Sequence, residues 1–202
     1  AAASHMYLGA ATDAIDMISI GAHKLGGPVN SGALILRREI DLEMPNPGGG
    51  QERGHRGGTV DVAAAVGLAA ACRATAAERI DVNERLGALR MRFENAISFI
   101  KGVSITARDE SRIAGVTHLT VQGASSEELL FLLDEAGVSA SGGSSCASGA
   151  LEPSHVLLAM GMSPEQAKGA VRFSYGHLTT KEDIDYAIGA LADAVYRLRG
   201  EK

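Results

Sequence analysis

The chain has 202 residues, 46% of them hydrophobic and 21% charged, which are ordinary values for a globular protein of one large or two small domains. Its net charge of −5, with no basic run and no tryptophan, argues against a protein that binds nucleic acid or an anionic membrane surface. Two distant cysteines do not make a disulfide framework, so we expect a reducing compartment, the cytoplasm. The most apolar run, Val62–Cys72, is too short to span a bilayer.

The first residues predict a chain that begins in the middle of a fold. Residues 1–6, A-A-A-S-H-M, look like a cloning scar and are set aside. A strand at residues 16–20 follows with no earlier hairpin or helix. A glycine-rich turn, Gly21–Pro28, then leads into a second apolar strand at residues 32–37.

A long polar loop comes next, Pro45–Thr59, P-N-P-G-G-G-Q-E-R-G-H-R-G-G-T. Its six glycines exclude regular structure and indicate a binding loop or a linker. Backbone N–H groups freed by glycine, together with Arg53, His55, Arg56 and the Thr59 hydroxyl, are suited to hold a phosphate or carboxylate. A flexible linker has a similar composition.

Two helices are predicted after the loop. The first, Asp61–Arg79, is rich in alanine and apolar nearly all round, which indicates a buried or bridging helix with Cys72 as a core thiol. The second, Asn83–Phe99, is amphipathic. From about Val82 the pattern becomes that of an α+β domain.

This α+β region alternates strands with capped helices. Three strands and three helix starts carry the clearest signals: strands at 103–107, 116–121 and 170–174, and helices capped by Ser125 or Ser126, by Ser163 and by Thr180. The last helix, 181–199, has a continuous apolar face.

Cys146 lies in a segment of small polar residues, Ser139–Ser154, S-A-S-G-G-S-S-C-A-S-G-A-L-E-P-S. Small neighbours leave a thiol accessible and let the backbone carry it to a reagent, so Cys146 is a candidate nucleophile. The alternative is a flexible loop in which the cysteine is incidental.

Three further residues are candidates for a site. Lys24 lies between a strand end and a glycine turn, where a lysine facing a cleft can form a Schiff base, although most lysines are solvated surface residues. His23 can donate to an anion or simply pack at the strand end. Arg172, within a strand, requires a carboxylate partner, and we favour a structural Asp or Glu over a substrate. The histidines show no metal-ligand spacing.

Four motifs in order resemble the C-terminal half of a cysteine desulfurase of the NifS/IscS type, a fold-type I enzyme dependent on pyridoxal 5'-phosphate (PLP). They are Ala22-His-Lys24 with Gly26-Gly-Pro28, Gly48–Thr59, Gly143-Ser-Ser-Cys146 with Leu151-Glu-Pro-Ser154, and Arg172-Phe-Ser-Tyr-Gly176 with Thr179-Thr180. The resemblance covers nearly the whole chain after residue 6.

The resemblance implies a role for five residues. Lys24 matches the lysine that forms a Schiff base with the cofactor and moves protons at the substrate Cα. His23 matches a ligand of the cofactor phosphate, and Thr59 matches a threonine that reaches the phosphate of the partner subunit, which implies a homodimer. Arg172 matches the arginine that binds the carboxylate of L-cysteine. Cys146 matches the cysteine that takes the substrate sulfur as a persulfide, and its long loop resembles the form that delivers sulfur to an acceptor or scaffold protein.

The implied fold is α/β, a remnant of the large PLP-binding domain followed by a small α+β C-terminal domain. The expected divisions are residues 1–6 (scar), 7–62 (large-domain remnant), 63–81 (bridging helix) and 82–202 (small domain). The implied reaction converts L-cysteine to L-alanine and serves iron–sulfur cluster assembly or another sulfur pathway.

The chain departs from the family at two positions and in length. Gly21 stands where the family often has a phosphate-binding serine, and Gln51 stands where it usually has histidine. The family is about twice as long, so we expect this chain alone to bind PLP weakly or not at all. Two alternatives stay open: a selenocysteine lyase or other class V aminotransferase relative, and a non-catalytic sulfur-relay module that uses Cys146 without a cofactor.

Overall fold

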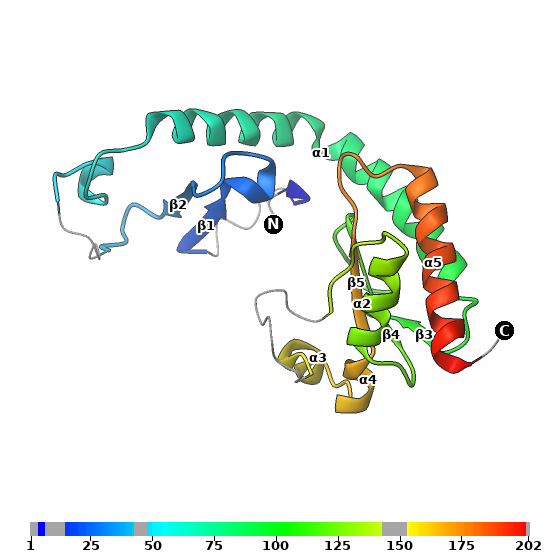
Figure 1. Ribbon diagram of the computed structural model, residues 1–202. Coiled ribbons are helices and arrows are strands. Elements are labelled where there is room, and N and C mark those ends of the chain that lie inside the picture. The colour runs from blue at the N-terminus through cyan, green and yellow to red at the C-terminus, as the bar shows by residue number, and fades with distance from the viewer. Residues whose placement is uncertain (1–3, 7–14, 43–47, 143–152, 201–202) are drawn as a thin grey trace. The chain divides into compact units, whose positions relative to one another are not determined.

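The computed structural model describes residues 4–6, 15–42, 48–142 and 153–200. Contacts within the chain divide it into two compact units, Ala1–Asp81 and Val82–Lys202, whose elements are labelled in Figure 1. Across the described ranges, the structure contains no helix that is long and apolar enough to cross a membrane.

The first unit contains an antiparallel hairpin. β1 (Met17–Gly21) pairs with β2 (Gly32–Leu36), and Gly21 lies opposite Gly32. Position 32 has no room for a side chain, because a Cβ there would lie 2.4 Å from the carbonyl oxygen of Ile20. The two strands predicted from the sequence are confirmed.

α1 (Val62–Ile97) is one continuous helix where the sequence predicted two. The predicted break between Arg79 and Asn83 was wrong. The residues between them, Ile-Asp-Val, include no glycine or proline, so nothing there removes a backbone hydrogen bond or favours a turn.

The two parts of α1 differ in burial. None of residues 62–81 is buried, whereas Leu86, Phe93 and Ile97 are at most 1% exposed. Cys72 is exposed, so the prediction of a core thiol was wrong for this chain, and of the two alternatives for this helix, buried or bridging, burial is not observed. Alanine has a high helix propensity because it loses no side-chain entropy when the helix forms. The helix can therefore form here without a core around it.

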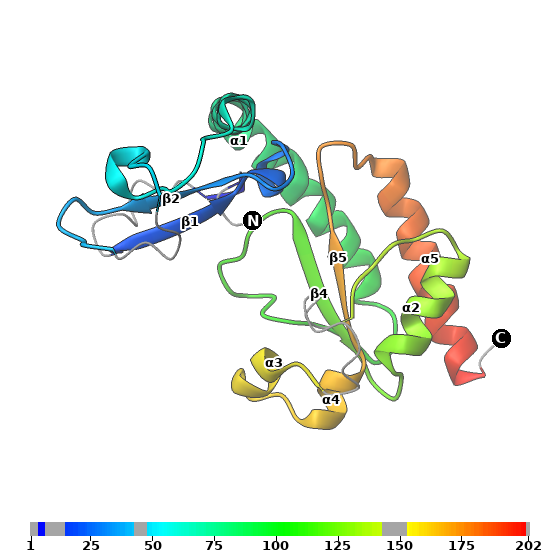
Figure 2. The same ribbon diagram turned by 60° about the vertical axis from the view of Figure 1, so that its left-hand side comes forward.

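The second unit has a three-stranded antiparallel sheet in the order β3-β4-β5. The strands are β3 (Val103–Ile105), β4 (Val116–Val121) and β5 (Ala170–Ser174). Figure 2 shows α2 and α5 on the same side of β4 and β5. The core includes Phe93 of α1, whose ring lies 4.9 Å from that of Phe173 between centroids. The predicted α+β arrangement is therefore observed in this unit.

Four helices of the second unit have defined ends. They are α2 (Ser126–Glu135), α3 (His155–Ala159), α4 (Pro164–Lys168) and α5 (Lys181–Arg199). Capping boxes form at Ser125, Ser163 and Thr180, where each hydroxyl accepts from the backbone N–H three residues on. These caps confirm the helix starts predicted from the sequence.

A buried polar network joins α1 to the sheet. Arg112 donates two hydrogen bonds to the two carboxylate oxygens of Glu94, at 2.8 and 2.9 Å. The Thr117 hydroxyl donates to the same carboxylate, and the Tyr175 hydroxyl donates to Thr117. Burial raises the pKa of a carboxyl, but the hydrogen bonds from Arg112 and Thr117 outweigh it and hold the pKa of Glu94 below its ordinary value. This network was not predicted from the sequence.

Candidate functional site

Lys24 and His23 lie on a single tight turn directly after β1. The turn is the 3₁₀ helix η4 (Ala22–Leu25), which ends at Gly26 with a φ of +78° that favours glycine. The buried Ala22 is fixed on both sides, since its N–H donates to Ser31 and its carbonyl accepts from Gly27, each at 2.9 Å. The side chains of His23 and Lys24 are exposed, so the backbone of the turn is fixed while the described residues do not withdraw the amine from solvent.

The turn packs closely against α1. A Cβ at Gly67 of α1 would lie 2.5 Å from the Cγ atom of Pro28, and a Cβ at Gly27 would lie 3.2 Å from the Cβ of Ala71. Both glycines therefore allow the turn and the helix to approach, and α1 sets the position of η4. Sequence analysis overlooked Gly67, although a lone glycine in an alanine-rich helix signals such a contact.

The described part of the glycine-rich loop, residues 48–59, holds a tight turn that the sequence did not predict. The turn is η5 (Glu52–Gly54), closed by backbone hydrogen bonds between Gln51 and Arg56 at 3.0 and 3.1 Å. Glu52 and Arg53 have φ values of +49° and +58°, a costly conformation for residues other than glycine. The loop is therefore held in a defined shape.

The loop presents its polar groups outward. Arg53, Arg56 and Thr59 are exposed and His55 is half-buried. In both views the ribbon segments of η5 (cyan) and η4 (blue) lie apart (Figures 1 and 2). Within the first unit, the structure therefore does not bring the loop and the Lys24 turn together.

Arg172 lies in the middle of β5 in the second unit. Its backbone exchanges two hydrogen bonds with Ser141, at 2.7 and 3.0 Å, and its Nη2 donates to the Ser141 hydroxyl at 3.4 Å. Its Nε is buried and has no hydrogen-bond partner. Over the ranges that the structure describes, no carboxylate pairs with Arg172, so the expectation of a structural Asp or Glu is not met there.

Cys146 lies outside the described residues, which stop at Gly142 and resume at Pro153. The residue before Gly142 is Ser141, the backbone partner of Arg172. The segment that contains Cys146 thus begins one residue after the backbone bridge between Ser141 and Arg172 of β5. The sequence predicted Arg172 and Cys146 separately and overlooked the bridge at Ser141.

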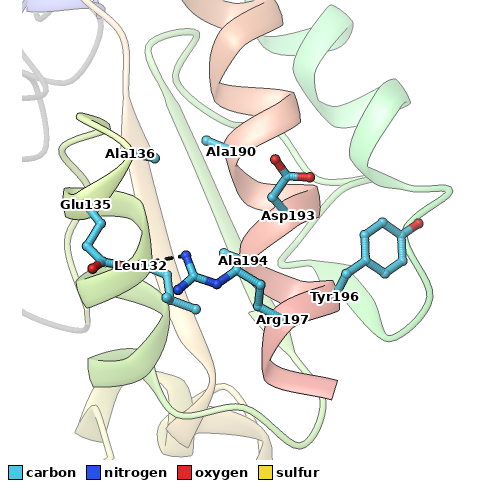
Figure 3. Close-up of a pocket in the computed structure, with 8 residues that line it drawn as sticks. All are labelled: Leu132, Glu135, Ala136, Ala190, Asp193, Ala194, Tyr196 and Arg197. Atoms are coloured by element: carbon cyan, nitrogen blue, oxygen red, sulfur yellow. Dashed lines mark hydrogen bonds and ion pairs between the residues drawn. The ribbon is translucent and has the colours of Figure 1, made fainter. Parts of the chain in front are cut away.

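The second unit also has a hollow between α2 and α5, with a volume of about 440 Å³ (Figure 3). Small apolar residues form its floor, and Glu135 forms an ion pair with Arg197 across it at 3.4 Å. The lining residues are Leu132, Glu135, Ala136, Ala190, Asp193, Ala194, Tyr196 and Arg197. None of the predicted site residues lines this hollow.

Comparison with known proteins places these residues in a family context. The family model described as "Aminotransferase class-V" matches residues 1–187. Over 187 residues the chain is 41% identical to the IscS-like cysteine desulfurase of Mycobacterium tuberculosis (strain ATCC 25618 / H37Rv), and 41% identical to the cysteine desulfurase IscS of Tolumonas auensis. These matches cover 92% of this chain but 48% and 46% of the relatives, so the chain spans about half the length of the curated relatives it matches.

Solved structures agree with this relationship. A NifS-like protein from Rickettsia africae matches with a TM-score of 0.85 at 26% identity, covering 96% of this chain and 51% of that one. Another NifS-like protein matches with a TM-score of 0.80 at 27% identity, covering 91% of this chain and 47% of that one. The resemblance to NifS/IscS proteins and the mixed α/β fold predicted from the sequence are confirmed.

Proposed function

The chain belongs to the aminotransferase class-V family, and we propose that it forms part of a PLP-dependent cysteine desulfurase that converts L-cysteine to L-alanine and takes the sulfur onto Cys146 as a persulfide. The term "complete enzyme" denotes a protein of the relatives' full length that contains this chain, which matches about half of that length. The homology covers half of such an enzyme, so the activity is proposed for the complete enzyme.

One observation carries the proposal: the guanidinium of Arg172 has a buried Nε without a partner and no carboxylate beside it in the described ranges. Burying part of a charged group without compensation is costly, and a planar guanidinium is suited to hold a carboxylate by two parallel hydrogen bonds. An amino-acid substrate supplies that carboxylate.

Among the described residues, Lys24 and His23 have the chemistry needed to hold PLP. Lys24 offers an exposed primary amine on a turn that α1 holds in place, which is what covalent attachment to an aldehyde requires. His23 on the same turn can donate a hydrogen bond to the cofactor phosphate. When bound, PLP supplies an electron sink for the bonds at the substrate Cα. Lys24 then removes and returns protons at that carbon.

Arg172 fixes the orientation of the substrate. With the carboxylate held at the guanidinium, the Cα and the thiol of L-cysteine keep a set direction, so bond breaking does not have to wait for a rare orientation. Cys146 follows Ser141, the bridge partner of β5, by five positions, and its thiolate attacks the substrate sulfur. The S–S bond of the persulfide forms as the Cβ–S bond of L-cysteine breaks, and the electron pair of the broken bond stays with the carbon chain, which takes up a proton on the way to L-alanine. The persulfide sulfur passes next to an acceptor or scaffold protein.

A homodimer follows from the same proposal. Thr59 matches the threonine that, in the resembling NifS/IscS enzymes, reaches the cofactor phosphate of the partner subunit, and its side chain is exposed. In such a dimer the exposed loop of one copy supplies Thr59 to the phosphate site beside Lys24 of the other copy.

The experiment is the substitution Lys24→Ala in the complete enzyme. With a thiol added to reduce the persulfide, we expect alanine and sulfide formation from L-cysteine to fall by about a thousandfold or more, since the amine both attaches the cofactor and transfers protons. Lys101→Ala, which removes another exposed amine, is the matched control and should retain full activity. Sulfide formation by Lys24→Ala at the wild-type rate would overturn the proposal.

Two added measurements separate the alternatives. A sulfur-relay module would still accept a persulfide from an added donor and would never form alanine from L-cysteine. A selenocysteine lyase would release selenide from selenocysteine much faster than sulfide from L-cysteine.

A further inference from the structure

The sheet of the second unit has two unlike faces. Because side chains alternate along a strand, Leu119, Val171 and Phe173 point to the face that packs against the helices. The neighbouring positions His118 and Arg172 point to the opposite face and are half-buried. This second face carries the guanidinium that the proposed function assigns to substrate binding.

The register makes His118 the nearest cross-strand neighbour of Arg172. The two residues are direct partners between β4 and β5. The N–H and C=O of Arg172 are both bonded to Ser141, so they point away from β4. The backbone carbonyl of His118 accepts from the N–H of Thr106, the residue directly after β3, at 2.9 Å. The pair is therefore of the non-hydrogen-bonded kind, in which the two side chains approach most closely.

The imidazole of His118 is held by a hydrogen bond, and its surroundings favour the neutral form. Its Nδ1 lies 2.8 Å from the Thr106 hydroxyl in a hydrogen bond. Burial, and then the charge of Arg172, lower the pKa of His118 below its ordinary value of 6.5. The ring beside the guanidinium is thus in surroundings that disfavour a second positive charge.

We propose that His118 is a positioning residue for Arg172: its ring, anchored by Thr106, supports one side of the guanidinium while Ser141 holds the other, so that the nitrogen fork faces an incoming carboxylate. The proposal rests on the proposed function, in which Arg172 binds the carboxylate of L-cysteine. His118 itself does not touch the substrate and acts only through Arg172.

The arrangement couples two events. A carboxylate at Arg172 offsets the positive charge that His118 experiences, so protonation of the imidazole becomes easier when substrate is bound. By reciprocity, a protonated His118 accompanies tighter carboxylate binding. Over the residues that the structure describes, the charge acting on His118 is that of Arg172.

The first test measures the pKa of His118 by NMR in the 202-residue chain, with the resonance assigned by its loss in His118→Asn. We expect the pKa of His118 to rise in Arg172→Gln, because the neighbouring positive charge is gone. Lys181→Gln removes a cation at the start of α5 and should leave the pKa unchanged. An unchanged pKa in Arg172→Gln would overturn the proposed contact.

The second test measures steady-state kinetics of the complete enzyme. We expect His118→Ala to raise the KM for L-cysteine roughly fivefold with kcat little changed, since one oriented contact to a charged group is lost. His118→Asn, whose amide can keep the hydrogen bond to Thr106, should restore most of the wild-type KM. Thr120→Val changes a residue on the same sheet face that lies opposite Ala170, and it should leave KM unchanged.

The outcomes separate this inference from the proposed function. If Arg172→Gln leaves KM unchanged, the carboxylate site of the proposed function fails. If Arg172→Gln raises KM while His118→Ala does not, the positioning role fails and the proposed function stands. A fall in kcat alone for His118→Ala would also overturn positioning. If His118→Ala does not fold, the kinetics of His118→Asn and the NMR titration decide.

Discussion

The two units differ in how they bury their side chains. Ala22 is the one buried hydrophobic residue in the described part of residues 1–81. The second unit packs α1, α2, α5 and the sheet around a continuous cluster that contains Phe93, Leu119, Leu129 and Leu191, all fully buried. Within the described residues the first unit therefore buries little apolar surface, whereas a packed core stabilises the second.

The candidate site residues follow the same division. Lys24 and Thr59 belong to the first unit, and Arg172 belongs to the second. Apolar side chains of the first unit remain open, with Val62 at 68% and Ile80 at 69% exposure. A cysteine desulfurase built from this chain would need to cover those side chains and hold Lys24 rigidly, so the cofactor attachment point is the part that depends most on the rest of the protein.

Hydrogen exchange measures this difference directly. In the 202-residue chain we expect amides of β4 and α5 to exchange about a thousandfold more slowly than those of β1, β2 and residues 62–81 of α1, because they open only with the core. Mass spectrometry of the exchanging chain resolves the segments. If the amides of β1, β2 and residues 62–81 exchange as slowly as those of β4 and α5, the first unit is more stable than the small number of its buried side chains suggests.

A core substitution sharpens the comparison. Phe93→Ala removes a ring that contacts Phe173 and Tyr175, and we expect the second unit to lose about 3–5 kcal/mol of unfolding free energy. Phe99→Ala is the matched control, because Phe99 is 89% exposed and its loss should change stability by less than about 0.5 kcal/mol. Chemical denaturation monitored by circular dichroism measures both. Similar losses for the two variants would contradict the assigned core.

The sequence predicted the elements whose signals are local. Strand alternation and the cap at Ser125 depend only on neighbouring residues, and the structure confirms them. The sequence did not predict the burial of α1, because an alanine-rich helix looks the same whether or not another surface covers it. It placed Cys72 in a core for this reason, and the thiol is exposed.

The sequence predicted the individual site residues, because each belongs to a short motif, but it did not predict their neighbours in space. Arg172 was identified within its strand, but its neighbours Ser141 and His118 come from segments 31 and 54 positions away, so only the sheet register brings them together. A register is a long-range property that a single sequence does not display. Cys146 keeps its proposed role from the motif alone, since it lies outside the described residues.

Disrupting the buried network at Glu94 should cause the smallest of these changes in stability, and this change should depend on pH. Glu94→Gln leaves the Arg112 charge without its partner, and we expect a loss of about 3 kcal/mol of unfolding free energy at pH 7. The pKa of Glu94 is lower in the folded than in the unfolded chain. Its contribution is therefore complete above the unfolded carboxyl's pKa and is lost as pH falls through the folded-state pKa. Urea denaturation of both proteins across pH measures this difference.

The stability gap between wild type and Glu94→Gln should accordingly narrow as the pH falls below the ordinary glutamate pKa of 4.5. Glu135→Gln is the matched control, because its ion pair with Arg197 is largely exposed and should contribute little at any pH. If the difference in unfolding free energy between wild type and Glu94→Gln stays constant down to the acid transition, the negative charge of Glu94 does not contribute to the stability of the protein. Shape and hydrogen bonding, which glutamine partly keeps, would then account for its place in the core.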